Sequence, residues 1–325
     1  MKLNLCNLTL VLGVIACAST QSFAQSFPTK PIRFFVGYAA GGGTDTMARA
    51  VATKLPEILK QQVIVENRPG ANANLAAEYV TRQPADGYTV LFISVSHAMS
   101  KSVYTNLGYD IERDFVPLTL VAEVPNLLAV HPSLPVKTVN DLIKMAKTMP
   151  GQITYGVAGT GSPGHFAGEM LNMTSKIKML AIPYKGGGPL AIDLMAGHVM
   201  ATFNAMPPLL PLVRSHRIRA IAVSTTKRVS VLPDVPTIAE SGVPGYAMST
   251  WYGCVVKSGT PAEIVTLLNQ AVLKTLTMPD VQKSLANLGA DIIGGSVAET
   301  ADFLKSEVAK YAKVAKAAKI RVDNK

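Results

Sequence analysis

Residues 31–49, PIRFFVGYAAGGGTDTMAR, join an apolar strand pattern to a helical pattern through three consecutive glycines. Glycine between a strand and a helix lets the backbone approach another group closely, and the free N–H groups at a helix start attract anions. The stretch therefore predicts a strand–loop–helix unit whose loop holds a ligand.

The same order of elements repeats along the chain. Apolar periodicity predicts helices over 44–60 and 72–83, strands over 62–68 and 89–94, and further strand–helix pairs from 138 to 224. Alternation of this kind predicts βαβ units in mostly parallel sheets with flanking helices, which is an α/β fold. No Pro/Gly/Ser-rich linker divides the chain, so we expect it to cross between domains within packed strands, near 124–126 and 252–256.

Small and polar residues stand at four predicted strand ends that lead directly into helices. The carboxyl ends of parallel strands line the ligand crevice of such sheets, and helix starts there carry partial positive charge. We therefore predict one site for a carboxylate or a similar anion, built from residues 39–45, 94–100, 159–165 and 184–189.

The glycine loops do not match the nucleotide-binding motifs. A Walker A loop needs G-x-x-x-x-G-K-[ST], whereas Lys185 precedes its glycines. A dinucleotide fingerprint G-x-G-x-x-G that begins at Gly41 would need glycine where Thr46 stands. The spacing therefore argues against a nucleotide ligand.

A secreted hydrolase is the sharper alternative. Ser162 stands three residues before His165, and Asp45 or Asp193 could complete a catalytic triad. A nucleophile elbow, however, requires glycine two residues before the serine, where Thr160 stands. A serine followed by proline is typical of a helix N-cap, so we favour a structural role for Ser162.

Composition narrows the class of partner. The 325 residues carry a net charge of +10, with 48% hydrophobic residues and a single tryptophan. The basic residues are scattered and lack the interleaved aromatic residues of a nucleic-acid stacking surface, so we expect no nucleic acid. The five histidines stand singly, without an H-x-x-x-H pair, so we predict neither a metal nor a cofactor.

The first 24 residues have the features of a secretory signal peptide. Lys2 precedes an apolar core, LTLVLGVIACA, that is too short to span a bilayer comfortably, and SFA supplies small residues before the cleavage point. We predict cleavage after Ala24 and export to the periplasm. A lipoprotein cleaved before Cys17 is the less favoured alternative. Cleavage would leave Cys254 as the only cysteine, in a pattern typical of a buried strand.

Six motifs occur in order between Phe27 and Val322: GGGTDTMAR, VENRPGA, PADGYTVLF, PYKGGGP, LPDVPTIAESGVPGY and KYAKVAKAAKI. Together they resemble the Bug family, the extracytoplasmic solute-binding proteins of tripartite tricarboxylate transporters. The resemblance implies a two-lobed periplasmic binding protein fold, type II-like, that closes around one small carboxylate. It places lobe 1 at 25–125 and 254–325 and lobe 2 at 126–253. It also implies membrane transporter subunits as partners, and we expect a monomer.

The resemblance also implies which residues contact the ligand, largely through backbone amides and ordered water. The predicted contacts from lobe 1 are Tyr38, Gly41, Gly42, Gly43, Thr44, Asp45, Ser96 and His97, and those from lobe 2 are Thr160, Gly161, Ser162, His165, Tyr184 and Gly186. A structural role for Asp45 is as well supported as a ligand contact, because an acidic residue at a helix start stabilises the helix and can pair with Arg49, four residues later.

Two departures from the family pattern bear on the ligand. Asn204 stands where the family commonly has Asp; a neutral side chain there favours a plain carboxylate, whereas Asp would receive an amine. The loop after Asn67 reads PGANA instead of PGAGG, which leaves its role open. We predict a solute-binding protein that is not an enzyme; the alternatives are the Ser162 hydrolase and a sensor module without a transporter.

Overall fold

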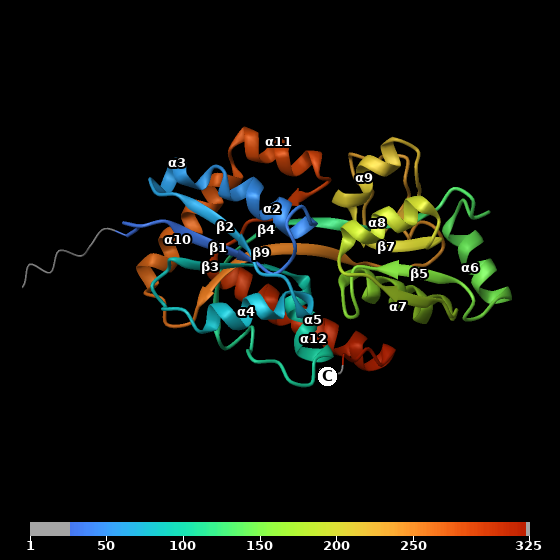
Figure 1. Cartoon of the computed structure of the whole chain (residues 1–325), viewed down its shortest axis with the longest axis horizontal. Coiled ribbons are helices and arrows are strands. Elements are labelled where there is room, and N and C mark those ends of the chain that lie inside the picture. The colour runs from blue at the N-terminus through green and yellow to red at the C-terminus, as the bar shows by residue number, and fades with distance from the viewer. Residues whose placement is uncertain (1–26, 323–325) are drawn as a thin grey trace, which may run out of the picture.

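The computed structural model describes residues 27–322, and the predicted signal peptide, with Cys17 and the cleavage site after Ala24, lies outside that range. Figure 1 shows two lobes side by side, each with its own sheet and flanking helices. The predicted α/β, two-lobed architecture is confirmed.

The first lobe is built on the strand order β2–β1–β3–β9–β4. Strands β1, β2 and β3 are mutually parallel, whereas β9 runs antiparallel to both β3 and β4. Its elements are β1 (Ile32–Val36), α2 (Gly43–Ala52), α3 (Leu55–Leu59), β2 (Val63–Asn67), η1 (Ala71–Ala73), α4 (Asn74–Thr81), β3 (Thr89–Ser94), α5 (Val95–Val103), β9 (Ser249–Lys257), α10 (Ala262–Leu276), α11 (Pro279–Asn287) and β10 (Asp291–Ile292).

The second lobe is built on the strand order β8–β4–β7–β5–β6. Strand β5 is parallel to β6 and β7, and β7 and β8 are antiparallel to β4. Its elements are α6 (Val139–Thr148), β5 (Thr154–Val157), α7 (Pro163–Ser175), β6 (Leu180–Pro183), α8 (Gly187–Ala196), β7 (Ala201–Ala205), α9 (Met206–Arg214) and β8 (Arg219–Val223).

Strand β4 (Phe115–Val130) belongs to both sheets. From Phe115 to Pro125 it pairs with β9, and from Asn126 onward it pairs with β7 and β8. The chain therefore passes between the lobes inside a hydrogen-bonded strand. The lobe boundaries predicted after residues 125 and 253 fall within β4 and β9.

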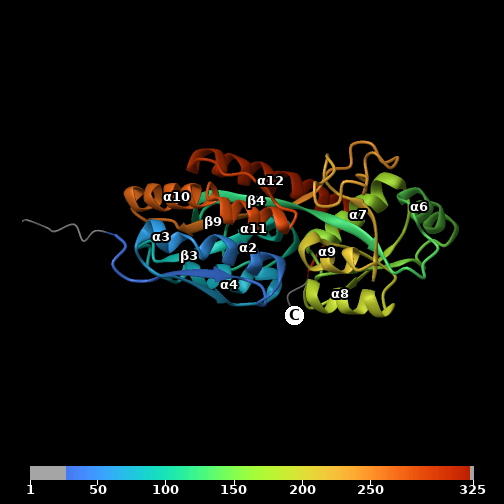
Figure 2. The same ribbon diagram turned by 90° about the horizontal axis from the view of Figure 1, so that it is seen from above.

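Helix α12 (Val297–Ala318) packs against both lobes, as Figure 2 shows from above. It contacts α5 of the first lobe, α7 of the second lobe and β4, which belongs to both. The Tyr311 ring meets Phe166 of the second lobe edge-on, with centroids 5.6 Å apart. The Trp251 Nε1 donates to Glu307 Oε2 at 2.7 Å, so α12 is anchored by both aromatic packing and a buried hydrogen bond.

Two predicted helices differ from the structure. The helix predicted over 44–60 is two helices, α2 and α3, because Pro56 in the first turn of α3 has no N–H to continue the α2 ladder. The helix predicted over 72–83 begins only at Asn74, because the preceding residues from Ala71 to Ala73 have left-handed backbone angles. Among the described residues, no helix is long and apolar enough to span a bilayer.

Candidate ligand-binding site

The four predicted loops follow the carboxyl ends of β1, β3, β5 and β6. Two of these strands belong to the first lobe and two to the second, and each loop leads into a helix: α2, α5, α7 or α8. Parallel strands place such helix starts at one edge of their sheet. Two helix starts are therefore contributed by each lobe.

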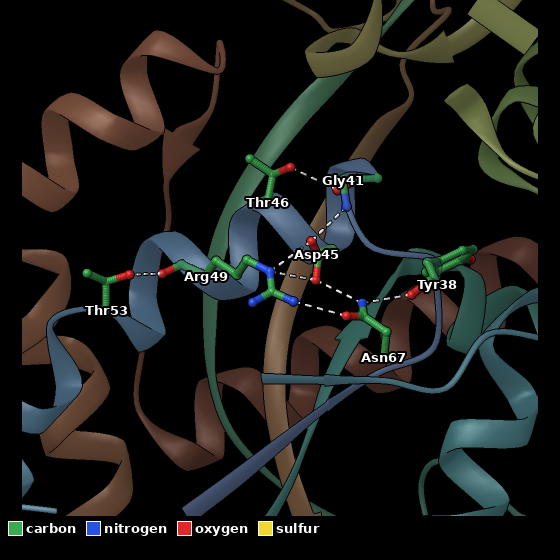
Figure 3. A network of polar contacts seen from close by, with 8 residues as sticks. Tyr38, Gly41, Asp45, Thr46, Arg49, Thr53 and Asn67 are labelled. Carbon is green, nitrogen blue, oxygen red and sulfur yellow. Dashed lines mark hydrogen bonds and ion pairs between the residues drawn. The ribbon is translucent and has the colours of Figure 1, made fainter. Parts of the chain in front are cut away.

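The loop before α2 is held by the side chain of Asp45. Its carboxylate accepts hydrogen bonds from the Gly41 N–H at 2.8 Å, from Arg49 Nε at 3.0 Å and from Asn67 Nδ2 at 2.8 Å (Figure 3). The predicted helical pair between Asp45 and Arg49 is confirmed. Asn67 also donates to the Tyr38 carbonyl, so both ends of the loop are fixed by this network.

These hydrogen bonds determine the charge of Asp45. Burial alone would raise its pKa, but the donated hydrogen bonds from Arg49, Gly41 and Asn67 outweigh burial and hold the pKa below its usual value. The residue is 2% exposed and its oxygens are occupied by protein donors. Asp45 therefore fixes the conformation of the loop. The N-cap residue of α2 is Gly42, which has no side chain to accept a hydrogen bond, so the first N–H groups of α2 are left for other acceptors.

Tyr38 and Ser96 connect the first loop to α5. The Tyr38 hydroxyl lies 2.7 Å from Ser96 Oγ and 2.9 Å from Asn72 Oδ1. Burial raises the pKa of Tyr38 to about 12, so the phenol remains protonated at neutral pH. The Tyr38 side chain is therefore uncharged, and its one hydroxyl proton is directed at Asn72 or Ser96.

His97, in the first turn of α5, is fully buried. Its Nδ1 lies 3.2 Å from the Ser94 N–H, whereas its Nε2 has no partner among the described residues. Burial lowers the pKa of His97 to about 4, so the ring is neutral at pH 7. The same Nδ1 lies 3.2 Å from the Ser94 carbonyl oxygen as well, so whichever ring nitrogen carries the proton, Nε2 is a buried polar atom without a partner among the described residues.

In the second lobe, Ser162 and His165 organise the start of α7. Ser162 is the N-cap and its Oγ accepts the His165 N–H at 3.4 Å, as predicted for a serine before a proline. His165 Nδ1 accepts the Gly161 N–H at 3.0 Å. Each side chain serves the helix start, so the two do not form a nucleophile–base pair.

Asn204 stands between two helix starts. A Cβ placed on Gly187, the first residue of α8, would lie 2.7 Å from Asn204 Nδ2, and a Cβ on Gly164 of α7 would lie 2.0 Å from the neighbouring Phe203 carbonyl. The side chain is 5% exposed; its Oδ1 accepts the Ala205 N–H at 3.0 Å, and its Nδ2 has no described partner. A buried, unpaired donor therefore faces the start of α8.

The remaining predicted residues lie in the loops after β5 and β6. Tyr184, half-buried at the end of β6, has its pKa raised by burial and by Asp193 nearby. Gly186 is the N-cap of α8, with φ 111, which a residue with a side chain adopts only with strain. Thr160 is half-buried in the loop after β5.

Three residues near the loops were not predicted. Asn67 and Asn72 hydrogen-bond to the loop before α2 and to Tyr38, and the Tyr252 hydroxyl lies 3.2 Å from where a Cβ on Gly43 would stand. The motif NRPGANAN contained the signal for the first two, because asparagines among glycine and alanine are typical of left-handed turns. Tyr252 gave no signal, since its strand pattern predicts only burial.

Two surface hollows lie away from these loops, with volumes of about 580 and 490 Å³. One adjoins the end of α12 and the other lies beside α6. Within residues 27–322, no group of three or more His, Cys, Asp or Glu side chains is arranged to hold a metal ion.

The family model described as the tripartite tricarboxylate transporter family receptor matches residues 47–320. The chain belongs to this receptor family. Its members are solute-binding receptors, not enzymes, and they are extracytoplasmic. The resemblance to the Bug proteins is confirmed by BugT of Bordetella pertussis, which is 33% identical over 96% of this chain and 97% of its own length.

Solved structures of receptor-family proteins have the same fold. R. palustris Rpa4515 with adipate is 40% identical, with a TM-score of 0.87 over 91% of this chain and 100% of that one. MatC from Rhodopseudomonas palustris with bound malate is 29% identical, with a TM-score of 0.83 over 89% and 99% of the two chains. The two-lobed periplasmic binding protein fold and the solute-binding role of this receptor are thus shown by sequence and structure together.

Proposed function

We propose that this receptor captures a small carboxylate between its lobes and presents it to the membrane subunits of a tripartite tricarboxylate-type transporter. The observation that carries the proposal is the set of donors at the loops. Helices α2, α7 and α8 start there, and Asn204 Nδ2 is a buried donor without a partner among the described residues. A ligand that only accepts hydrogen bonds, such as a carboxylate, complements such a site.

The same donors favour a carboxylate over an amine. Tyr38 is protonated and His97 is neutral, and the carboxylate of Asp45 is occupied by its own loop. An ammonium group in the site would therefore find no free anion at these positions. Adipate in Rpa4515 and malate in MatC are both dicarboxylates, which supports this class for the present chain.

Closure of the lobes supplies the affinity in this proposal. Helix starts at the ends of β1 and β3 come from one lobe and those at the ends of β5 and β6 from the other. A ligand that bridges them has higher affinity for the closed form, and this difference drives closure. We assign the ligand contacts to the residues predicted from the sequence, which are Tyr38, Gly41–Asp45, Ser96, His97, Thr160–Ser162, His165, Tyr184, Gly186 and Asn204.

Export and assembly belong to the same proposal. We propose a periplasmic monomer released by cleavage after Ala24, with lobe 1 formed by 25–125 and 254–325 and lobe 2 by 126–253. The family membership supports partnership with transporter membrane subunits. N-terminal sequencing of the secreted protein tests the cleavage site, since a lipid-anchored form would instead begin at Cys17.

A calorimetric screen with matched ligands tests the binding proposal. Succinate, malate and adipate are compared with adipamide, which has the length of adipate but carries neutral amides. We expect at least one dicarboxylate to bind at a stoichiometry of one and adipamide to bind much more weakly. Equal binding of adipate and adipamide, or no binding of any carboxylate, would contradict the proposal.

Two variants of the loop before α2 test whether its backbone holds the ligand. Gly42 has φ −72, an angle that valine adopts without strain. The Cβ of a residue at this position would lie 3.2 Å from the Ala39 carbonyl oxygen. We expect Gly42→Val to weaken binding more than Asp45→Asn, because valine obstructs the N–H groups of α2 while asparagine retains an oxygen for Gly41. The reverse order would show that the Asp45 charge, not the backbone, dominates.

A further inference from the structure

The turn before α4 has an unusual backbone. Gly70, Ala71, Asn72 and Ala73 have φ angles of 140, 46, 54 and 76. Left-handed angles are strained for residues with a Cβ, and asparagine tolerates them better than alanine. Strain in successive residues persists only where surrounding contacts determine the conformation, which makes the contacts of this turn informative.

The Asn72 side chain joins the two lobes. Its Oδ1 accepts the Tyr38 hydroxyl at 2.9 Å within the first lobe. Its Nδ2 donates to the Gly161 carbonyl at 3.1 Å, in the loop between β5 and α7 of the second lobe. One amide group thus contacts a predicted ligand-binding residue in each lobe.

The bond to Gly161 lies in a contact region between the lobes. A Cβ on Gly161 would lie 3.0 Å from Val103 Cγ1, at the end of α5, and 3.7 Å from Val322. The Gly161 N–H is held by His165, so the carbonyl that Asn72 contacts belongs to a peptide segment already fixed within its own lobe. Movement of the second lobe away from the first would therefore break the bond to Asn72.

The hydrogen bonds continue into the first lobe. The Tyr38 hydroxyl that contacts Asn72 also lies 2.7 Å from Ser96 Oγ, in the first turn of α5. The series Ser96–Tyr38–Asn72–Gly161 connects the starts of α5 and α7 without a charged group. With alanine or glycine at position 72 the turn could still form, but the Gly161 carbonyl would lose the Asn72 donor.

We propose that Asn72 is a positioning residue that latches the closed form, holding the lobe-2 loop at Gly161 against Tyr38 of lobe 1. The inference rests on the proposed function, since closure around a ligand is what the latch would stabilise. A single hydrogen bond across the lobes changes the affinity by about 2- to 10-fold. Its loss acts on the closed form, so dissociation of the ligand becomes faster while association changes little.

Three variants separate the amide from the backbone. Asn72→Gly removes the amide and relieves the left-handed strain, so a folding defect is not expected. Asn72→Asp keeps an oxygen for Tyr38 and the tolerance of left-handed angles, but it loses the donor to Gly161. Ala71→Gly is the matched control, because it relieves the same strain at φ 46 in the neighbouring exposed residue without removing a polar group.

The experiment measures X-ray scattering of the purified, ligand-free protein and stopped-flow dissociation of adipate. We expect Asn72→Gly and Asn72→Asp to have a larger radius of gyration than the native protein and about 2- to 10-fold faster dissociation, while Ala71→Gly matches the native protein. Equal behaviour of Asn72→Gly and Ala71→Gly in both measurements would overturn the latch. If the native protein does not bind adipate or another dicarboxylate, the proposed ligand class fails, and the scattering comparison alone then decides the latch.

Discussion

Replacing Asn204 by aspartate should separate stability from ligand affinity. Asn204 Nδ2 is buried, has no described partner and faces the first residue of α8. An aspartate would place a carboxylate beside the starts of α7 and α8, where anions are stabilised by about 0.3 to 1 kcal/mol. This gain opposes the larger cost of burying a charge at a side chain that is only 5% exposed, so the empty Asn204→Asp protein should not melt higher than the native protein.

The same charge should oppose a bound carboxylate. Two unit charges about 5 Å apart, in surroundings with an effective dielectric constant of about 20 to 40, repel by about 2 to 3 kcal/mol. This energy corresponds to a dissociation constant roughly 30- to 200-fold higher. The substitution also removes the donor that Nδ2 offers, so both changes act in the same direction.

Succinate and aspartate form a matched pair of ligands, because they differ by one amino group. Calorimetry at pH 8 should show that Asn204→Asp weakens succinate binding and shifts the preference toward aspartate, whose ammonium group would meet the new carboxylate. Thermal unfolding of the same samples without ligand gives the stability change. Unchanged succinate affinity in a folded Asn204→Asp protein would refute the placement of Asn204 in the site.

Three further predictions concern the loops themselves. Asp45→Ala should lower the free energy of unfolding by about 2 to 4 kcal/mol, because the Gly41 and Asn67 donors lose a buried acceptor. The ion pair with Arg49 adds little to this value, since Arg49 is half-exposed. A loss below about 0.5 kcal/mol in urea titrations would contradict this role. The pKa of His97 is about 4 in the folded protein and about 6.5 when unfolded, so the unfolded state binds more protons between these values. Stability should therefore fall by about 3 kcal/mol as pH drops from 6.5 to 4, and this part of the slope should be missing in His97→Gln. Ser162→Ala should lower the free energy of unfolding by about 1 kcal/mol through loss of the α7 cap, which urea titration measures; an unchanged free energy would contradict the capping role.

The fold could be predicted from the sequence because its signals are local. The glycines at 41–43 mark the start of α2, and Ser162 before proline marks the start of α7, both from rules that involve only neighbouring residues. The same rules predicted a crossing inside a packed strand near 124–126, but they could not identify the partners of β4 in the two sheets. Its residues are apolar on both sides of Pro125, and the change of partners there depends on β7 and β9, which lie about 75 residues or more farther along the chain.

The site was predicted less completely, and the residues that were missed have a common physical reason. Asn67 and Asn72 act through side-chain amides on backbone and side-chain groups in other loops, and the bond from Asn72 to Gly161 spans 89 positions in the sequence. Spacing rules detect residues that share a helix face or a turn, whereas the Asn67 bonds form only when separate loops of the first lobe pack together, and the bond from Asn72 to Gly161 forms only when the two lobes meet. A sequence can nevertheless mark such residues indirectly. An asparagine between alanines in a left-handed turn has strained backbone angles, and such strain persists only where surrounding contacts determine the conformation. The turn therefore indicates where a long-range contact of the amide should be sought.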